Sequence, residues 1–531
     1  MRPTDKNRGA RLHLTLGLLS VLAFLGGCRP AGEAPTLEAG EIPPPPQASV
    51  DVQHYAVEVT LPDLEVPLRL QGRVALTVEH GALPALRLDA APGLRVDTAQ
   101  VNGAQVTPRR EGAHLWIPLP SYPPGTYVDT VYVAYQGAVD EGLYRAPYAD
   151  QAIVYTDAWP LRARGWLPAV HHPSDPATLS LHLDLPDGVE AVATGTPVDT
   201  TRTSGRVRYR WQLSASAPTY TYAFAVAEDF QEQTFEADNL LVRHYALDQA
   251  RVDTLDTEAM LAFFTQRIGP YAFGRYETVQ VPIPWLGMEQ AATSFINAEA
   301  LSQGRARETL VHELVHQWFG NRVTLADWSD LWLSEGFATY LTTLYIEAAD
   351  GRDAARRRWV QLAAYGPTRQ ATHTALVPAD PVDPVAHLTW VPYEKGAAVL
   401  HLLRLTLGEA AFDRLLRTTY ETYAGQALST SAFQQLAEAE AGRSLATLFG
   451  VWVYGQDVPV LRAVWSTAER RLDWSVVGDA GTLDDLPWEL EVTQGQRRLY
   501  VPASAGHVVL PGSAPPEVRP VGILLDVQGP G

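Results

Sequence analysis

Two histidines four residues apart carry the clearest chemical signal in the sequence. His312 and His316 frame Glu313 in His-Glu-Leu-Val-His, within residues 308–322, which hold no Pro and no Gly before Gly320. On a helix, residues four apart lie on the same face, so both imidazoles can bind one metal ion. Glu313 projects close by but offset, where a water bound to the metal would lie. The pentapeptide therefore predicts a catalytic zinc site on a helix.

A third protein ligand is expected because catalytic zinc usually takes three and leaves one position for water. Glu335 is the candidate, with eighteen residues between it and His316, in the helix-like stretch 326–345. An antiparallel helix after a short loop could bring it to the ion. The alternative is a chance motif on a core helix, with two buried histidines hydrogen-bonded and Glu313 exposed to solvent.

The elements that would position these residues change in type along the chain. From about 50 to 230, apolar and polar residues alternate as in half-buried strands, which predicts a large antiparallel sheet domain. The predicted strands are 54–61, 73–80, 129–137, 177–186, 206–213 and 220–228. The following region has helical spacing at 255–269, 305–318, 329–348, 395–406, 409–423 and 430–440, with one strand at 277–283. Short strands return after about 457.

Taken together, these motifs resemble those of the gluzincin aminopeptidases, the family of membrane alanyl aminopeptidase and leukotriene-A hydrolase. The resemblance rests on HELVHQWFGNRVT followed by LWLSEGFATYL at the family's spacing. Three further stretches agree: LGMEQ (286–290) is similar to the exopeptidase motif, YEKGA (393–397) to the tyrosine motif, and 143–168 to a β-domain segment that borders the active site. Thermolysin-type endopeptidases have a similar signature, but their spacer is one residue longer and they lack the other motifs.

The resemblance implies a role for each residue of the centre. His312, His316 and Glu335 would bind one zinc ion per chain. Glu313 would take a proton from the zinc-bound water and pass it to the leaving amine. Tyr393 would donate a hydrogen bond to the tetrahedral oxyanion.

Substrate binding is implied by the same resemblance. Glu289, with Gly287 and Met288 beside it, would hold the free α-ammonium group of the substrate, which explains exopeptidase action because only an N-terminus supplies a cation there. Asp157 stands where the family usually has Gln or Glu as a second amine anchor; its alternative is a solvated surface aspartate. Trp285 and Met288 are candidates for the walls of the first-residue pocket.

Three positions depart from the family pattern. Leu286 replaces the first Gly of the exopeptidase motif, Gln290 replaces its Asn, and Ser334 replaces the usual Asn before the third ligand. The first two concern the backbone path and the contact to the peptide carbonyl beside the scissile bond.

The N-terminal residues are typical of a bacterial lipoprotein. A basic stretch (1–11) and a short apolar run (12–26) precede Leu25-Gly26-Gly27-Cys28, which resembles a lipobox, with cleavage before Cys28 and acylation of its thiol. Cys28 is the only cysteine, so no intramolecular disulfide can form. The proline-rich residues that follow predict a spacer. A formal net charge of -19 argues against a nucleic-acid partner.

The sequence thus predicts a multidomain α+β protein. Its parts are a lipoprotein signal peptide (1–27), a Pro-rich linker (28–48), an N-terminal β domain (49–232), a thermolysin-like and mainly helical zinc peptidase domain (233–456), and a small C-terminal β domain (457–531). The expected activity is removal of N-terminal residues from peptides with a free N-terminus, on the outside of a bacterial membrane. The alternatives are a non-catalytic peptide-binding surface lipoprotein and an epoxide hydrolase-like activity in the same zinc site.

Overall fold

The computed structural model describes residues 41–237, 240–248, 256–365, 373–389, 391–478, 483, 486–523 and 525–529. The predicted signal peptide, Cys28 and the first part of the linker lie outside these residues. No helix in the described part of the chain is both long and apolar enough to cross a membrane.

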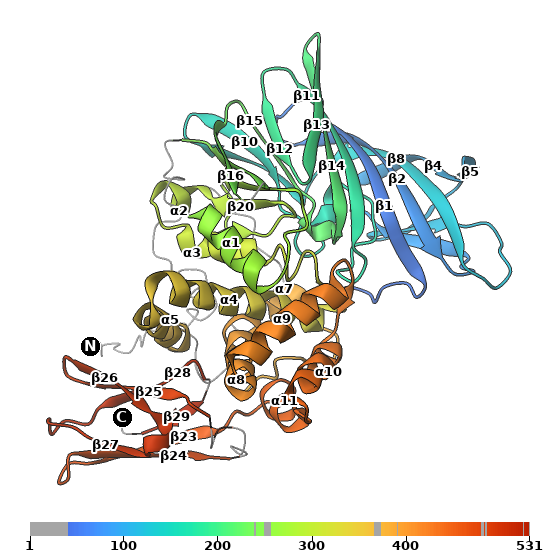
Figure 1. The fold of residues 1–531 in the computed structure, drawn as a ribbon. Helices are drawn as coiled ribbons and strands as arrows, with labels where there is room; N and C mark the ends of the chain where they lie inside the picture. Colours follow the sequence, from blue (N-terminus) through green and yellow to red (C-terminus); the bar gives the residue numbers. More distant parts are fainter. Residues whose placement is uncertain are drawn as a thin grey trace, which may run out of the picture.

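The N-terminal region is built on one large twisted sheet, drawn in blue and green in Figure 1. Its strands, in order across the sheet, are β13 (Thr196–Thr203), β14 (Arg206–Ala217), β11 (Ala177–Pro186), β1 (Val50–Thr60), β2 (Arg69–His80), β8 (Tyr127–Ala138), β4 (Leu94–Val101) and β5 (Ala104–Val106). The prediction of a purely antiparallel sheet is wrong at one pair, because β11 runs parallel to β1. The connection between them includes several other strands and is long enough for the crossover that a parallel pair requires.

Alternation along each strand gives the large sheet a buried face. In β1, Tyr55, Val57 and Val59 are buried, whereas Glu58 on the opposite face is exposed. Two smaller sheets cover the buried face. They consist of β12 (Glu190–Ala193), β15 (Phe224–Ala227), β10 (Gln151–Thr156) and β9 (Leu143–Tyr148), and of β3 (Ala85–Asp89), β7 (His114–Pro118) and β6 (Arg109–Glu111).

The catalytic region combines a five-stranded sheet with helices. The sheet order is β16 (Gln231–Ala237), β17 (Leu240–Ala246), β18 (Arg275–Val281), β20 (Thr293–Asn297) and β19 (Gly287–Met288). The helices are α1 (Thr257–Arg267), α2 (Ala298–Ser302), α3 (Arg307–Val315), α4 (Trp332–Asp350), α5 (Arg352–Tyr365), α7 (Pro384–His387), α8 (Gly396–Leu407), α9 (Glu409–Tyr423), α10 (Thr430–Ala441) and α11 (Ala446–Trp452). Because β16 begins at Gln231, the sheet starts two residues before the predicted boundary at 233.

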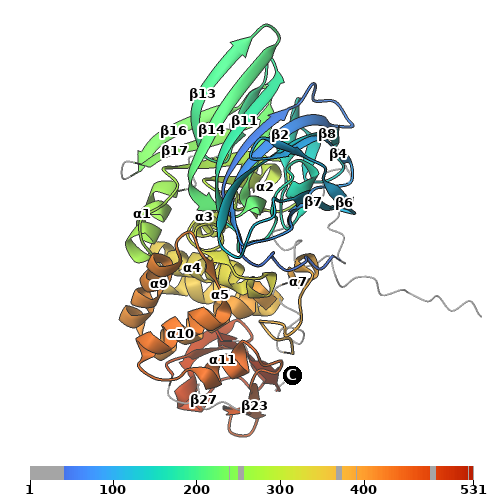
Figure 2. The ribbon, with the colours of Figure 1, turned by 90° about the vertical axis from the view of Figure 1, so that its right-hand side faces the viewer.

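The C-terminal region forms two small sheets. One consists of β27 (His507–Val509), β24 (Arg471–Val477), β23 (Val460–Ser466) and β29 (Asp526–Gln528), the other of β26 (Arg497–Pro502), β25 (Glu489–Gln494) and β28 (Glu517–Val521). The second of these sheets packs against α5, where Arg356 pairs with Glu489 at 2.6 Å and lies 4.8 Å from the ring centroid of Tyr500. The helices thus form a layer between the N-terminal and C-terminal sheets (Figure 1, Figure 2).

The predicted α+β architecture is confirmed, and most predicted elements exist with shifted ends. β11 and α9 have the predicted bounds. The predicted helix 329–348 begins later, at Trp332, because Trp328–Asp330 form a separate 3-10 turn. The predicted strand 220–228 divides into the 3-10 turn η2 (Thr219–Thr221) and β15.

Candidate active site

Three predicted metal ligands converge where α3 meets α4. Glu335, in the first turn of α4, has its Oε2 atom 3.2 Å from Nε2 of His312 and 3.4 Å from Nε2 of His316. Two ligand atoms bound at 2.0–2.1 Å to a tetrahedral zinc ion would lie about 3.3–3.4 Å apart. The carboxylate oxygen is therefore spaced from each imidazole nitrogen as two ligands of one tetrahedral ion are, and all three donor atoms lie within 4.8 Å of one another.

The other side of the His316 ring is held by groups that sequence reasoning did not connect to it. Its Nδ1 atom lies 3.1 Å from the carbonyl oxygen of Phe319 and 3.0 Å from Oγ of Ser334. A proton on Nδ1 donated to that carbonyl leaves Nε2 with a free lone pair for a metal. Gly320 makes this possible, because its φ is 120° and a Cβ atom there would lie 2.5 Å from Oγ of Ser334.

The charges of the centre also suit a cation. Burial opposes ionisation of Glu335, but the positive charge of His316 and hydrogen bonds from both histidines lower its pKa to about 2. Burial lowers the pKa of His316, but Glu335, Glu289 and Glu313 together raise it to about 10. Three buried carboxylates thus share one imidazolium. A divalent cation at the three donor atoms would compensate them instead, and the residues fit such an ion.

Glu313 is buried against the backbone of β19. Its side chain has room there because Gly287 has no Cβ; such an atom would lie 2.3 Å from Oε1 of Glu313. Burial raises the pKa of Glu313 well above its usual value, with a smaller opposing effect from His316. The alternative of an exposed Glu313 is wrong, because the residue is only 5% exposed. A carboxyl group in this setting can hold and release a proton beside the metal ligands.

Tyr393 lies in a π-helical turn, η5 (Val391–Lys395), directly before α8. Its ring is nearly parallel to that of His312, at an interplanar angle of 15° and a centroid distance of 6.0 Å. Burial, and after it the negative charges of Glu335, Glu289 and Glu313, raise the pKa of the phenol well above its usual value. Its hydroxyl group therefore stays protonated and can donate a hydrogen bond.

Two glycines allow α8, which directly follows η5, to lie close to α4, the helix that carries Glu335. A Cβ atom on Gly336 would lie 2.9 Å from Cα of Gly396, and one on Gly396 would lie 3.0 Å from Cα of Gly336. The backbones of α4 and α8 therefore touch directly after Glu335 and three residues after Tyr393.

Glu289 follows β19 and faces the same centre. One carboxylate oxygen of Glu289, one of Glu313 and one ring nitrogen of His316 lie within 4.8 Å of one another. Burial raises the pKa of Glu289 to about 7, against the positive charge of His316. Asn321 fixes the backbone here by donating from Nδ2 to the carbonyl oxygen of Glu289 at 2.7 Å.

Asp157, the predicted second amine anchor, is buried and already paired. It is 1% exposed, so the alternative of a solvated surface aspartate is wrong. Its Oδ1 atom lies 2.5 Å from Nη2 of Arg162, and its Oδ2 atom accepts a hydrogen bond from Nε1 of Trp285 at 3.1 Å.

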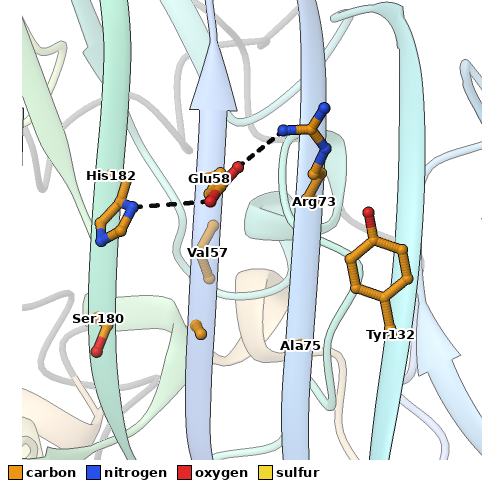
Figure 3. Close-up of a pocket in the computed structure, with 8 residues that line it drawn as sticks. Val57, Glu58, Arg73, Ala75, Tyr132, Ser180 and His182 are labelled. Atoms are coloured by element: carbon orange, nitrogen blue, oxygen red, sulfur yellow. Dashed lines mark hydrogen bonds and ion pairs between the residues drawn. The ribbon is translucent and has the colours of Figure 1, made fainter. Parts of the chain in front are cut away.

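A shallow recess on the outer face of the large sheet shares no residue with this centre (Figure 3). Glu58 occupies its middle and pairs with Arg73 at 3.0 Å and with His182 at 3.8 Å. The charges of Glu58 and Arg73 compensate one another there on an open sheet face.

Comparison with known proteins identifies the catalytic region. A family model described as Peptidase family M1 domain matches residues 254–452, which include both histidines, Glu335, Glu289 and Tyr393. This region of the chain is therefore similar to the peptidase family M1 domain. The metal of the family M1 structures is zinc, which the donor set and spacing here fit.

Curated relatives of this chain match it over part of their length. Leucine aminopeptidase 2 of Emericella nidulans is 28% identical over 253 residues, which cover 44% of this chain and 40% of that protein. Aminopeptidase B of Mus musculus is 28% identical over 297 residues, which cover 53% of this chain and 45% of that protein. The chain thus matches less than half the length of these relatives.

Solved M1 structures extend the likeness to the N-terminal sheets. The M1 zinc metallopeptidase from Deinococcus radiodurans is 28% identical, with a TM-score of 0.69 over 78% of this chain and 95% of that chain. A mutant of it has been solved bound to a Tyr-Ser-Ala substrate. Aminopeptidase A of Legionella pneumophila shares the fold at 16% identity, with a TM-score of 0.71 over 91% of this chain and 60% of that chain.

Several residues that shape this site had no motif to reveal them. Arg162 neutralises Asp157 from five residues away, and Tyr220 reaches the loop after His316 by donating from its hydroxyl to the carbonyl oxygen of Gly320 at 3.2 Å. The contact between Gly336 and Gly396 joins two helices that are far apart in sequence. Only the glycines carried a signal, since each interrupts a helical pattern and suggests a close approach.

Proposed function

We propose that the protein is a zinc-dependent aminopeptidase that removes N-terminal residues from peptides. When bound, zinc would activate water and polarise the scissile carbonyl. Glu313 accepts the proton of the attacking water at its carboxylate and delivers it to the leaving amine. Tyr393 donates a hydrogen bond to the carbonyl oxygen as negative charge develops there.

The position of Glu289 carries the exopeptidase assignment. The α-nitrogen and the carbonyl carbon of an amino acid are separated by two bonds, or about 2.5 Å. A group that holds the ammonium must therefore lie close to the groups that act on the carbonyl, and the oxygens of Glu289 and Glu313 lie within 4.8 Å of each other. A chain extending beyond the N-terminus would have to enter the space of a buried carboxylate, which favours a terminal ammonium group over an internal peptide bond.

The test compares one peptide with a free and with an acetylated N-terminus. The native protein should cleave the free peptide far better, and Glu289→Ala should reduce kcat/KM for the free peptide about tenfold to hundredfold, the worth of a charge-assisted hydrogen bond of roughly 1.5–3 kcal/mol. The acetylated peptide should be unaffected by the substitution, and zinc content should not change. Glu491→Gln, which alters a buried acid of the C-terminal sheets, is the matched control.

Two outcomes would redirect the assignment. Equal cleavage of both peptides by the native protein would indicate an endopeptidase. Full zinc occupancy without turnover of any peptide or amino-acid amide would leave a peptide-binding protein as the better description, and turnover of a lipid epoxide alone would favour the epoxide hydrolase alternative.

We further propose that Cys28 is lipidated and anchors the protein outside the cytoplasm of a bacterium. The lipobox-like quartet and the preceding basic and apolar stretches support this proposal. The described body begins at Glu41, which pairs with Arg164 at 2.5 Å, thirteen residues after Cys28. Thirteen residues reach at most about 45 Å, so the anchor would keep the body near the membrane.

Cell fractionation of Cys28→Ser tests the anchor. The variant should be found unprocessed or released, and should not incorporate labelled fatty acid. A correctly cleaved variant that stays in the membrane fraction would contradict the proposal.

A further inference from the structure

Both oxygens of the Asp157 carboxylate have a close polar neighbour within the protein. One oxygen pairs with Nη2 of Arg162 and the other accepts the indole N–H of Trp285. Arg162 also donates from Nε to the backbone carbonyl of Asp157 at 3.2 Å, so the arginine is bound twice to one residue. Both side chains are largely removed from water, with 13% of Arg162 and 1% of Asp157 exposed. Their charges therefore compensate each other at short range.

This pair lies at the end of the site where the first residue of a peptide substrate would bind. Trp285 precedes Gly287, whose backbone touches Glu313, and it is four residues from Glu289. Asp157 is tied to this segment by the hydrogen bond that it accepts from Trp285. Tyr144 lies close by, because it pairs with Tyr155 across β9 and β10, and the N–H of Asp157 donates to the carbonyl oxygen of Gly142 at 3.1 Å. The half-buried rings of Trp285 and Tyr144 give this end aromatic surface.

We propose that Asp157 and Arg162 form a neutral pair that positions Trp285 as a wall of the first-residue pocket, and that the site consequently selects uncharged first residues. This inference rests on the proposed aminopeptidase function. Asp157 is then a positioning residue, and Glu289 alone holds the substrate ammonium group. A basic first side chain finds the carboxylate of Asp157 already neutralised, and an acidic one finds the guanidinium of Arg162 already paired.

A double-variant cycle on the zinc-loaded full chain separates this proposal from a direct amine anchor. Asp157→Asn keeps an acceptor for Trp285 but leaves Arg162 uncompensated near the ammonium group, so KM for leucine amide should rise at least tenfold. Arg162→Gln leaves the charge of Asp157 free, so kcat/KM for lysine amide relative to leucine amide should rise at least tenfold. The combined variant removes both charges, and its KM for leucine amide should return at least fivefold toward the native value.

The wall is tested separately. Trp285→Phe keeps an aromatic ring but deletes the N–H that Asp157 accepts. Its preference for leucine amide over alanine amide should fall at least threefold while zinc content stays native. The matched control is the double variant Glu141→Gln and Arg164→Gln. It removes the 2.8 Å ion pair between Glu141 and Arg164, which lies in η1 (Arg162–Gly165) like Arg162. This control should change neither the selectivity nor KM.

The outcomes are distinguishable. If the native protein turns over no amide, the proposed function fails. If the native protein is active but the combined variant binds leucine amide as poorly as Asp157→Asn, Asp157 is a direct ammonium ligand and the neutral-pair proposal is refuted. If Asp157→Asn does not fold, the combined variant decides alone: a KM for leucine amide tenfold above that of the native protein refutes the neutral-pair proposal.

Discussion

Gly396→Ala tests whether the contact between α4 and α8 sets the position of Tyr393. The added methyl group would lie 3.0 Å from Cα of Gly336 and 3.4 Å from Cβ of Trp332. Carbon atoms prefer separations of about 3.5–4.0 Å, so the two backbones must separate by roughly 0.5–1 Å. Because Gly396 follows η5 directly, this separation moves Tyr393 away from the centre that contains Glu335.

The expected effect falls on turnover more than on folding. Overpacking costs about 1–3 kcal/mol, and replacing glycine by alanine in a helix returns up to about 1 kcal/mol. The net loss of about 0–2 kcal/mol leaves a folded protein. A displacement near 1 Å at a catalytic group can reduce the rate about a hundredfold, so kcat should fall roughly tenfold to hundredfold with zinc retained.

The assay is kcat and KM for an amino-acid amide, with zinc content and thermal unfolding measured on each sample. Gly450→Ala is the matched control, because a Cβ atom there meets nothing within 4 Å in α11. It should raise stability by about 0.4–1 kcal/mol and leave kcat unchanged. Tyr393→Phe should lower kcat by itself, and adding Gly396→Ala should then have little further effect if both act through the same hydroxyl group. A Gly396→Ala variant with kcat within twofold of native refutes the positional argument.

Three further predictions concern the ligands and the core of the N-terminal sheets. His316→Ala should lose zinc and activity together, whereas Glu313→Gln should keep zinc and lose most turnover; metal analysis beside an activity assay decides both. Ser334→Ala removes the hydroxyl 3.0 Å from Nδ1 of His316 and should weaken zinc binding about 10–100-fold in a chelator competition, and unchanged affinity would contradict its supporting role. Burial raises the pKa of Asp175 to about 7 despite the N–H donated by Val52, so the folded state holds a proton that the unfolded chain releases above about pH 4. Stability should therefore fall as pH rises from about 4 to 7, by up to roughly 4 kcal/mol, and denaturation of Asp175→Asn should show this part of the fall removed.

The local parts of the site could be predicted from sequence because they depend on short-range geometry. The spacing of His312 and His316 places both rings on one helical face whatever surrounds the helix. Apolar and polar residues alternate along β1 and β11 for a similar local reason, because only one face of the sheet is buried. Glu335 was a candidate from its place in a helix-like stretch, but its approach to the histidines could not be fixed from sequence, since the angle between two helices cannot be read from the residues of either one.

The remaining features depend on side chains that meet only after folding. Ser334 was noted as a departure from the family pattern, but its contact with His316 depends on the left-handed turn at Gly320. The parallel pairing of β1 with β11 arises from a long crossover that alternation cannot reveal, because alternation is the same in both orientations. The π-helical turn that carries Tyr393 lies mostly before the predicted helix 395–406, where helical spacing gave no signal for it.

Charge compensation explains why Glu289 should bind the substrate ammonium group and Asp157 should not. Asp157 and Glu289 are both buried carboxylates, and the family resemblance predicted that both would bind the substrate amine. Burying a carboxylate is unfavourable unless a cation accompanies it, so the nearest cation decides what each acid can bind. Arg162 accompanies Asp157 at 2.5 Å, whereas the charge that acts most strongly on Glu289 is that of His316, which a metal-bound histidine can no longer carry. Metal loading thus leaves Glu289 as the acid that gains most from an arriving ammonium group, while Asp157 gains little.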